Sequence, residues 1–205
     1  MPEHTWLEVL GSQWWIALVA LGVSLVVTPV FRFIAYRTGI VDRPDAALKP
    51  HRRPVAYLGG AAIWIGFLAG LIGLLIIRPD LSMRWPEIGR CLLEGRFGEL
   101  LENPLWNLLA VALASLTILV VGLLDDLLNI RPKHKVAGQV LVGIILFVGG
   151  VGTRMGTLVL SPLGLHHLLW LLLPLSAVML LVMTIAICNA ANLLDGLDGL
   201  CGGVT

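Results

Sequence analysis

Long apolar stretches separated by short polar segments dominate the hydropathy pattern of this chain. Five of them carry few or no charged residues, and they cover residues 14–33, 58–77, 105–124, 136–152 and 167–188. A helix needs about 20 mainly apolar residues to cross the hydrocarbon core of a bilayer, and several of these stretches reach that length. The pattern therefore predicts an all-α fold, a polytopic transmembrane helical bundle with about five spans.

Composition supports a membrane protein and excludes several other classes. Hydrophobic residues make up 58% of the 205 positions and charged residues only 13%, whereas a soluble domain has about 25% charged residues. The three cysteines, Cys91, Cys188 and Cys201, are odd in number and lack zinc-like spacing, so we expect no disulfide framework. The sequence carries no nucleic-acid-binding signature. The first stretch lacks a basic leader and is expected to be a retained span. We treat residues 1–205 as a single membrane domain.

The basic residues are distributed unevenly along the chain. Segments 32–57 and 125–135 hold nine of the fourteen Lys and Arg residues, and five acids offset the Arg residues of segment 78–104. Cytoplasmic loops of membrane proteins carry the excess of Lys and Arg. With five spans, this rule places the N-terminus outside and the polar segments after the first, third and fifth spans in the cytoplasm.

The last polar segment follows the fifth apolar stretch directly and reads NAANLLDGLDGL over residues 189–200. Carboxylates at or near hydrocarbon are costly, and for this reason they are candidates for function. Gly196 and Gly199 are poor helix formers, so we expect the helix to end near Asp195. The alternative is an ordinary Asn/Asp/Gly-rich turn that closes a helix.

A second acidic cluster, Asp125 and Asp126, ends the third apolar stretch. Acids at a helix C-terminus are disfavoured by the helix dipole, and two adjacent carboxylates repel each other. Lys133 and Lys135 are close in sequence, and Mg²⁺ is the other natural partner, because it binds carboxylates together with substrate phosphates. A solvated pair that caps the following segment is the alternative. With Asp195 and Asp198 on the same expected membrane face, a metal–phosphate site is favoured.

A basic segment, His51, Arg52 and Arg53, precedes the second apolar stretch and the pair Gly59–Gly60. Arg can hold phosphate oxygens bidentately, and a glycine pair allows close approach of a backbone. The alternative is topological, because basic residues that flank a span follow from the positive-inside rule alone.

Together, three motifs resemble the polyprenyl-phosphate N-acetylhexosamine-1-phosphate transferases, a glycosyltransferase family 4 type of enzyme. They are HRRPVAYLGG at 51–60, GLLDD at 122–126 with PKHK at 132–135 and Gln139, and NAANLLDGLDGL at 189–200. They stand in the family's order and at its span ends. The first and third look more like the undecaprenyl-phosphate α-N-acetylglucosaminyl 1-phosphate transferase branch than the phospho-N-acetylmuramoyl-pentapeptide transferase branch, which stays an alternative.

The resemblance implies a reaction, its substrates and its place in the cell. N-acetylhexosamine 1-phosphate, with N-acetylglucosamine as the favoured sugar, would pass from a UDP-sugar to undecaprenyl phosphate and release UMP. Mg²⁺ (or Mn²⁺) would be the cofactor. The resemblance implies that this would be a first membrane step of cell-envelope polysaccharide synthesis, such as lipopolysaccharide or teichoic acid synthesis, at the bacterial inner membrane. A homodimer is an open alternative for the assembly.

The resemblance also implies roles for individual residues of the three motifs. The catalytic residues would be Asp125, Asp126, Asp195 and Asp198. The substrate-binding residues would be His51, Arg53, Lys133, Lys135, Asn189 and Asn192. The metal ligands would be Asp125, Asp126 and Asp195. Whether one Asp attacks covalently or acts only as a base is left open.

The family pattern normally continues past Thr205 with further spans, another acid and a His-rich motif. We therefore expect an N-terminal fragment of a longer transferase, and a chain that is inactive or severely impaired by itself. A cation or proton transporter that uses the Asp clusters is the rival from another class, and it would require acids in the middle of a span.

Overall fold

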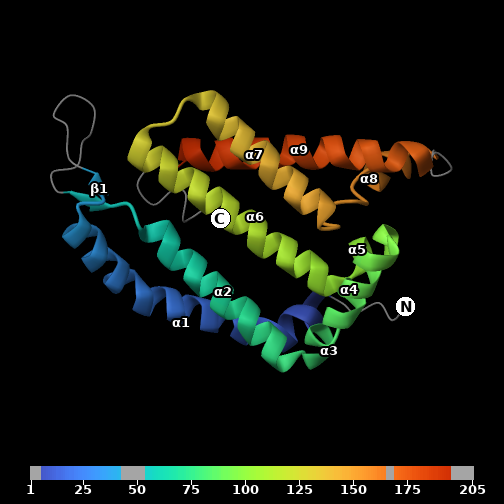
Figure 1. The fold of residues 1–205 in the computed structure, drawn as a ribbon, viewed down its shortest axis with the longest axis horizontal. Helices are drawn as coiled ribbons and strands as arrows, with labels where there is room; N and C mark the ends of the chain where they lie inside the picture. Colours follow the sequence, from blue (N-terminus) through green and yellow to red (C-terminus); the bar gives the residue numbers. More distant parts are fainter. Residues whose placement is uncertain (1–5, 43–53, 165–168, 195–205) are drawn as a thin grey trace. The chain divides into compact units, whose positions relative to one another are not determined.

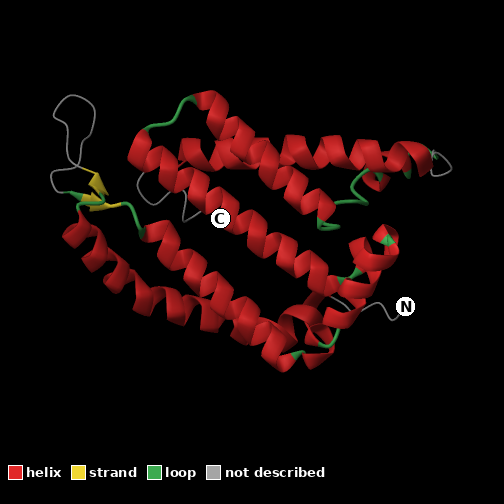
Figure 2. Cartoon of the chain, viewed as in Figure 1, coloured by secondary structure: helices red, strands yellow, loops and turns green. Residues whose placement is uncertain are grey.

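The computed structural model describes residues 6–42, 54–164 and 169–194 (Figure 1). Its elements, in chain order, are α1 (Trp6–Thr38), β1 (Val41–Asp42), β2 (Val55–Ala56), α2 (Gly59–Ile77), α3 (Pro79–Ser82), α4 (Trp85–Glu94), α5 (Phe97–Glu102), α6 (Pro104–Leu128), α7 (Pro132–Val148), α8 (Thr157–Leu160) and α9 (Leu169–Leu194). Helices dominate the described part of the chain (Figure 2). The strand pairing found there is a short antiparallel ladder in which Val41 faces Ala56. The predicted all-α fold is confirmed.

Within the described residues, four helices are long and apolar enough to cross a membrane, so the expected number of five spans is corrected to four for this part of the chain. They are Trp14–Thr38, Gly59–Ile77, Pro104–Leu128 and Trp170–Asn192. The expected span at 136–152 is α7, which has 17 residues and a length of about 26 Å at about 1.5 Å per residue. It ends at Val148 because Gly149 caps it and Gly150 adopts a positive φ of 82°. It therefore falls short of the roughly 30 Å hydrocarbon thickness.

The described residues form two compact units, and the single membrane domain stays a prediction. The first unit comprises residues up to 83 together with 122–129. Its centre is the antiparallel pair of α1 and α2, in which Gly66 lies against Ala20 and Gly70 lies against Ile16. An added Cβ at Gly66 would stand 2.5 Å from the Ala20 carbonyl oxygen. Small residues at this spacing let two helix backbones approach each other closely in lipid.

Polar contacts join the C-terminal end of α1 to the chain just before α2. The Tyr36 hydroxyl donates a hydrogen bond to the Pro54 carbonyl at 2.8 Å, and the Tyr57 amide donates to the Ile40 carbonyl at 3.4 Å. These contacts and the β1–β2 ladder hold both ends of the segment 43–53 together.

The second unit comprises residues 84–121 and 130 onward, and α7 is its central element. Helix α7 runs antiparallel to α6, because Gly138 lies against Val121 at one end and the Trp106 indole N–H donates to the Val148 carbonyl, at 3.0 Å, at the other. It also runs antiparallel to α9, because Gly143 packs on Leu181 and the start of α7 contacts the end of α9. Helices α6 and α9 therefore run in the same direction.

A buried serine fixes the turn after α7 to α9. Ser176 is fully buried, and its hydroxyl oxygen accepts a 2.8 Å hydrogen bond from the Gly156 amide. Because no water reaches this point, the bond satisfies a backbone donor that would otherwise be buried without a partner.

Replacement of Gly66 by Ala is expected to destabilise the first unit by about 1–3 kcal/mol, because the new methyl group meets the α1 backbone in a close-packed contact. Denaturation of the detergent-solubilised protein in SDS, followed by circular dichroism, measures the change. Gly22→Ala is the matched control, since a Cβ at Gly22 meets nothing within 4 Å. Equal stabilities of the two variants would contradict the proposed close approach.

Replacement of Ser176 by Ala is expected to lower the free energy of unfolding by about 1–2 kcal/mol, because the Gly156 amide loses its acceptor. Thr28→Val serves as the control, because the exposed Thr28 hydroxyl bonds only to Ser24 of its own helix. The same SDS titration applies, and a Ser176 variant as stable as the control would show that the bond contributes nothing.

Candidate functional site

The acidic pair lies at the C-terminal end of α6, as the sequence predicts. Helix α6 ends at Leu128 because Asn129 adopts a left-handed conformation, with φ of 48°, and its amide donates to the Asp125 carbonyl at 2.8 Å. This is the usual geometry of a helix C-cap. Asp125 is half-buried and Asp126 is exposed. Adjacent positions of a helix lie about 100° apart, so the two carboxylates leave the helix in different directions.

The predicted lysines lie in the first turn of α7. Pro132 begins the helix, Lys133 is exposed and Lys135 is half-buried. Cations are disfavoured at a helix N-terminus, where the dipole is positive and the backbone N–H groups point outward. Two lysines at this end therefore add to the positive potential, and an anion would relieve it.

Asn189, near the end of α9, is held by two hydrogen bonds. Its side-chain nitrogen donates to the Gln139 Oε1 atom at 3.2 Å and to the Ile185 carbonyl at 2.9 Å. Since a carboxamide nitrogen has two N–H groups, both are used, and the Oδ1 atom is the group left to accept from a ligand. The Ile185 carbonyl accepts only, so the orientation of the amide follows from the contacts.

Gln139 has a structural role that its position in the sequence alone does not reveal. It is only 7% exposed and lies one turn after Lys135 on α7. In the sequence, Gln139 belongs to the second motif but has no predicted catalytic, substrate-binding or metal-binding role. The available signal was one uncharged polar residue among the apolar positions of α7. Through its bond to Asn189, it joins the second motif to the third.

The structure brings together some of the predicted residues. Lys133, Lys135, Asn189 and the exposed Asn192 belong to the second unit, whereas Asp125 and Asp126 belong to the first. His51, Arg53, Asp195 and Asp198 lie outside the described residues, so their roles stay predictions. The described part of helix α9 runs to Leu194, and the expected helix end near Asp195 lies at the limit of the described residues and stays a prediction.

The described part of the chain contains no group of three or more His, Cys, Asp and Glu side chains that could hold a metal ion. Asp125 and Asp126 are still chemically suited to a hard cation, because Mg²⁺ commonly takes one or two carboxylates and completes its coordination with phosphates and water. The residues present therefore fit Mg²⁺ when a phosphate substrate supplies further ligands.

Comparison with known proteins agrees with the motifs. Residues 108–205 match the sequence model of glycosyl transferase family 4. The chain is 29% identical, over 92% of its length, to a probable undecaprenyl-phosphate N-acetylglucosaminyl 1-phosphate transferase of Bacillus subtilis, of which it covers 44%. It is 28% identical to a decaprenyl-phosphate N-acetylglucosaminephosphotransferase of Mycolicibacterium smegmatis, over 92% of this chain and 42% of the relative.

An Escherichia coli K12 protein is also similar. It is the undecaprenyl-phosphate alpha-N-acetylglucosaminyl 1-phosphate transferase, with 29% identity over 85% of this chain and 39% of the relative. The chain thus spans about two fifths of the length of these curated relatives. No solved structure matches the chain. The expected resemblance is confirmed: the chain is similar over most of its length to polyprenyl-phosphate N-acetylglucosamine-1-phosphate transferases, and residues 108–205 carry the pattern of glycosyl transferase family 4.

Proposed function

We propose that this chain forms part of a membrane phosphoglycosyl transferase that moves N-acetylglucosamine 1-phosphate from a UDP-sugar to undecaprenyl phosphate. The observation that carries the proposal is the contact between Gln139 and Asn189. It joins the start of α7, with Lys133 and Lys135, to the end of α9, where the third motif begins. The relatives named for this chemistry support the assignment.

The proposed chemistry is a phosphoryl transfer in which one bond forms and one breaks. An oxygen of the lipid phosphate bonds to the phosphorus that carries the sugar, and the anhydride bond to the uridine monophosphate breaks, so that UMP leaves. The protein contributes little covalent chemistry to such a reaction. It catalyses mainly by positioning the two substrates and by neutralising the charge on their phosphates. Lys133, Lys135 and the N-terminus of α7 would bind phosphate oxygens.

The carboxylates and amides have complementary parts in this proposal. Asp125 and Asp126 would orient the lipid phosphate and take its proton, or hold a divalent cation together with Asp195. Mg²⁺ (or Mn²⁺), when bound, would neutralise charge on the diphosphate. Asn189 would accept a hydrogen bond from the nucleotide sugar through its Oδ1 atom, and Asn192, about one turn further along α9, would contact the same substrate.

The orientation of the helices supports a shared cytoplasmic side for these groups. Helices α6 and α9 run in the same direction. Helix α7 lies between them in sequence and runs in the opposite direction, although it is shorter than the hydrocarbon core of a bilayer. The C-terminal end of α1 carries Arg32 and Arg37, which lie 5.8 Å and 5.2 Å from the ring centroids of Tyr36 and Phe33. Aromatic and basic residues gather at membrane surfaces. By the positive-inside rule we place the C-terminal end of α1 and, by the same rule applied separately, the lysine-bearing end of α7 in the cytoplasm of a bacterial cell.

The transporter alternative is less well supported. It requires carboxylates in the middle of a span, where they could relay ions. Asp125 instead follows the apolar part of α6 and lies in its final turns. The muramoyl-pentapeptide branch differs only in the donor, so an assay with both donors separates the two branches.

Replacement of Asp125 by Asn is expected to reduce transfer by about 10²–10⁴-fold, because the amide neither takes a proton nor binds a cation well. The assay follows labelled phospho-N-acetylglucosamine passing to undecaprenyl phosphate in membranes that hold the chain with its natural downstream sequence. Glu87→Gln, in α4, is the control and should keep full activity. An active, well-folded parent with an equally active Asp125 variant would refute the role of this carboxylate.

Replacement of Gln139 by Leu is expected to lower kcat/KM for the UDP-sugar about tenfold, because Asn189 loses the acceptor that fixes its amide, a bond worth about 1–2 kcal/mol. The control is Thr184→Val, on the same helix as Asn189, because the Thr184 hydroxyl bonds only to its own helix, at Leu180. Steady-state kinetics with varied UDP-sugar measure the effect. Unchanged kcat/KM in the Leu variant would show that the contact does not position Asn189.

A further inference from the structure

Helices α4 and α5 are fixed to the beginning of a membrane span. Asn103 is the residue between α5 and α6, and its side-chain Oδ1 accepts hydrogen bonds from the Leu105 amide at 3.0 Å and the Trp106 amide at 3.4 Å. This is an N-cap, which sets the direction in which the chain enters α6. Leu100 of α5 and Leu105 of α6 are both buried. The pair of short helices is therefore held where the span α6 reaches the membrane surface.

The sides of α4 differ in chemistry. Glu87, Arg90 and Glu94 fall within about 60° of one another around the helix, at about 100° per residue. Ile88 and Cys91 are buried, and α4 packs on α5. A third side is apolar, and its side chains are exposed among the described residues.

The uncovered side carries large apolar residues. Leu93 is 90% exposed, Phe97 of α5 63%, Trp85 53% and Leu92 48%. Trp85 and Leu92 lie on the side of α4 opposite the charged stripe. Tryptophan is enriched where membrane proteins cross the bilayer surface, and a helix that separates apolar and charged faces in this way is typical of one lying in that plane.

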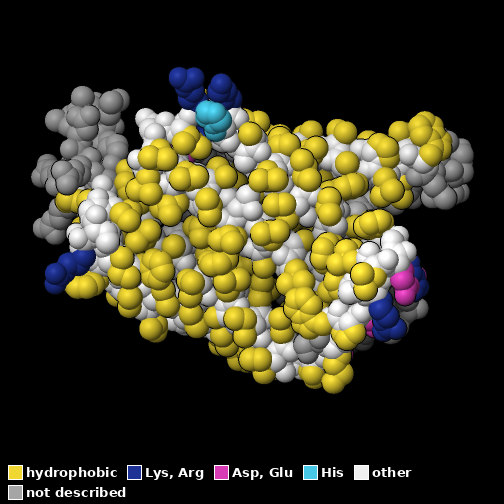
Figure 3. All heavy atoms as spheres, viewed as in Figure 1, with side chains coloured by type: hydrophobic (Ala, Val, Ile, Leu, Met, Phe, Trp, Pro, Cys, Tyr) yellow, Lys and Arg dark blue, Asp and Glu magenta, His cyan; other side chains and the backbone are white. Residues whose placement is uncertain are grey.

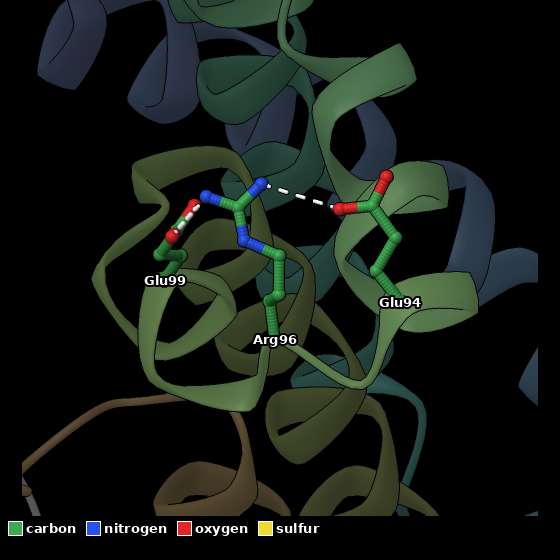
Figure 4. Close-up of polar contacts among 3 residues, drawn as sticks. All are labelled: Glu94, Arg96 and Glu99. Carbon is green, nitrogen blue, oxygen red and sulfur yellow. Dashed lines mark hydrogen bonds and ion pairs between the residues drawn. The ribbon is translucent and has the colours of Figure 1, made fainter.

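Most charged side chains of this region pair with one another, and arginines and glutamates are nearly equal in number. Arg96 lies between Glu94 and Glu99 and bonds to both (Figure 4). These carboxylates raise the pKa of the Arg96 guanidinium further, Glu99 more than Glu94. Arg154 bonds to Glu102 at 2.7 Å. The exposed pairs gather beside hydrophobic side chains on the molecular surface (Figure 3).

The same charged groups line a pocket of about 490 Å³. Its lining residues are Arg84, Glu87, Arg90, Cys91, Glu94, Arg96, Glu99, Glu102 and Asn103. Three of them are arginines and four are glutamates, so the pocket has no excess of positive charge that would attract an anionic headgroup. A hydrated surface is the environment that suits it.

We propose that α4 and α5 lie in the plane of the membrane surface as an interfacial anchor. Trp85, Leu92, Leu93 and Phe97 insert among the acyl chains next to the headgroups, and the Arg–Glu pairs face water. The contact with lipid is continuous with that of the span α6, which follows directly. Because the charges balance, the anchor binds zwitterionic phospholipid and needs no anionic lipid, in contrast to basic amphipathic helices.

This anchor lies at the opposite end of the second unit from Asn189. Trp106, at the start of α6, contacts the end of α7, whereas Gln139 and Asn189 meet at its start. The anchor therefore holds the far end of α6 and takes no part in the proposed transfer.

The test places spin labels on neighbouring residues of α4 in the whole chain, reconstituted in phosphatidylcholine nanodiscs. Cys91, Cys188 and Cys201 are first replaced by Ala, and single cysteines then replace Leu93 or Glu94. Collision with oxygen reports lipid, and collision with a water-soluble nickel complex reports water. Leu113→Cys, exposed in the middle of α6, is the lipid reference. Circular dichroism and gel filtration confirm that each labelled chain is folded.

We expect the oxygen-to-nickel ratio at position 93 to be several-fold higher than at position 94 and to approach that at position 113. Equal, water-like ratios at 93 and 94 would overturn the proposal. Protection of position 93 from both reagents would also overturn it, because that result means that protein, such as a second copy, covers the patch. Label at Phe97→Cys repeats the test if the Leu93 variant misfolds.

A second arm tests the kind of lipid. The ratio at position 93 should be the same in phosphatidylcholine discs and in discs that contain phosphatidylglycerol, and it should not change with salt. A high ratio only in the anionic discs would overturn the assignment to zwitterionic lipid.

Discussion

The close approach of helix backbones at glycine holds this protein together. In lipid there is no hydrophobic force to drive one apolar helix onto another, so association depends on van der Waals contact and hydrogen bonds. Glycine lets the backbones come near enough for both. Gly66 packs against the Ala20 carbonyl of α1. Gly138 packs against Val121 of α6, and Gly143 packs against Leu181 of α9.

The candidate site depends on this packing. Gly138 and Gly143 draw α7 against α6 and α9 on its two sides, and Gln139, between them in sequence, is buried as a result. A buried carboxamide needs partners, and Asn189 supplies one. The same contact that satisfies Gln139 also fixes which atom of Asn189 faces outward. Helix packing and the chemistry of the third motif are thus linked through one hydrogen bond.

Much of the fold follows from the sequence because a membrane span is a matter of length and composition. Four spans and the position of Asp125 at the end of α6 were predictable in this way. The expected fifth span, at 136–152, was wrong, because α7 stops at Gly149 and Gly150, and glycines inside an apolar stretch do not by themselves mark the end of a helix. The side of α2 that packs on α1 could not be predicted from the sequence either. Helix α2 is apolar on all sides, so no periodic pattern of polar and apolar residues distinguishes the side that carries Gly66. The orientation of Asn189 depends on a residue far away in sequence, and only the structure shows it. In the sequence the segment 78–104 reads as a charged connection, although the exposed Trp85 and Leu92 share the side of α4 opposite its charged residues.

The hydrogen bond from Tyr36 to Pro54 has a consequence for how the protein can vary. Together with the β1–β2 ladder, it brings the two ends of the segment that carries His51 and Arg53 together. The entropy lost on closing such a segment grows only with the logarithm of its length, by about 0.6 kcal/mol for each doubling. Insertions or deletions there cost little stability, so evolution can lengthen or shorten this basic segment while the α1–α2 helix pair that flanks it in sequence stays unchanged.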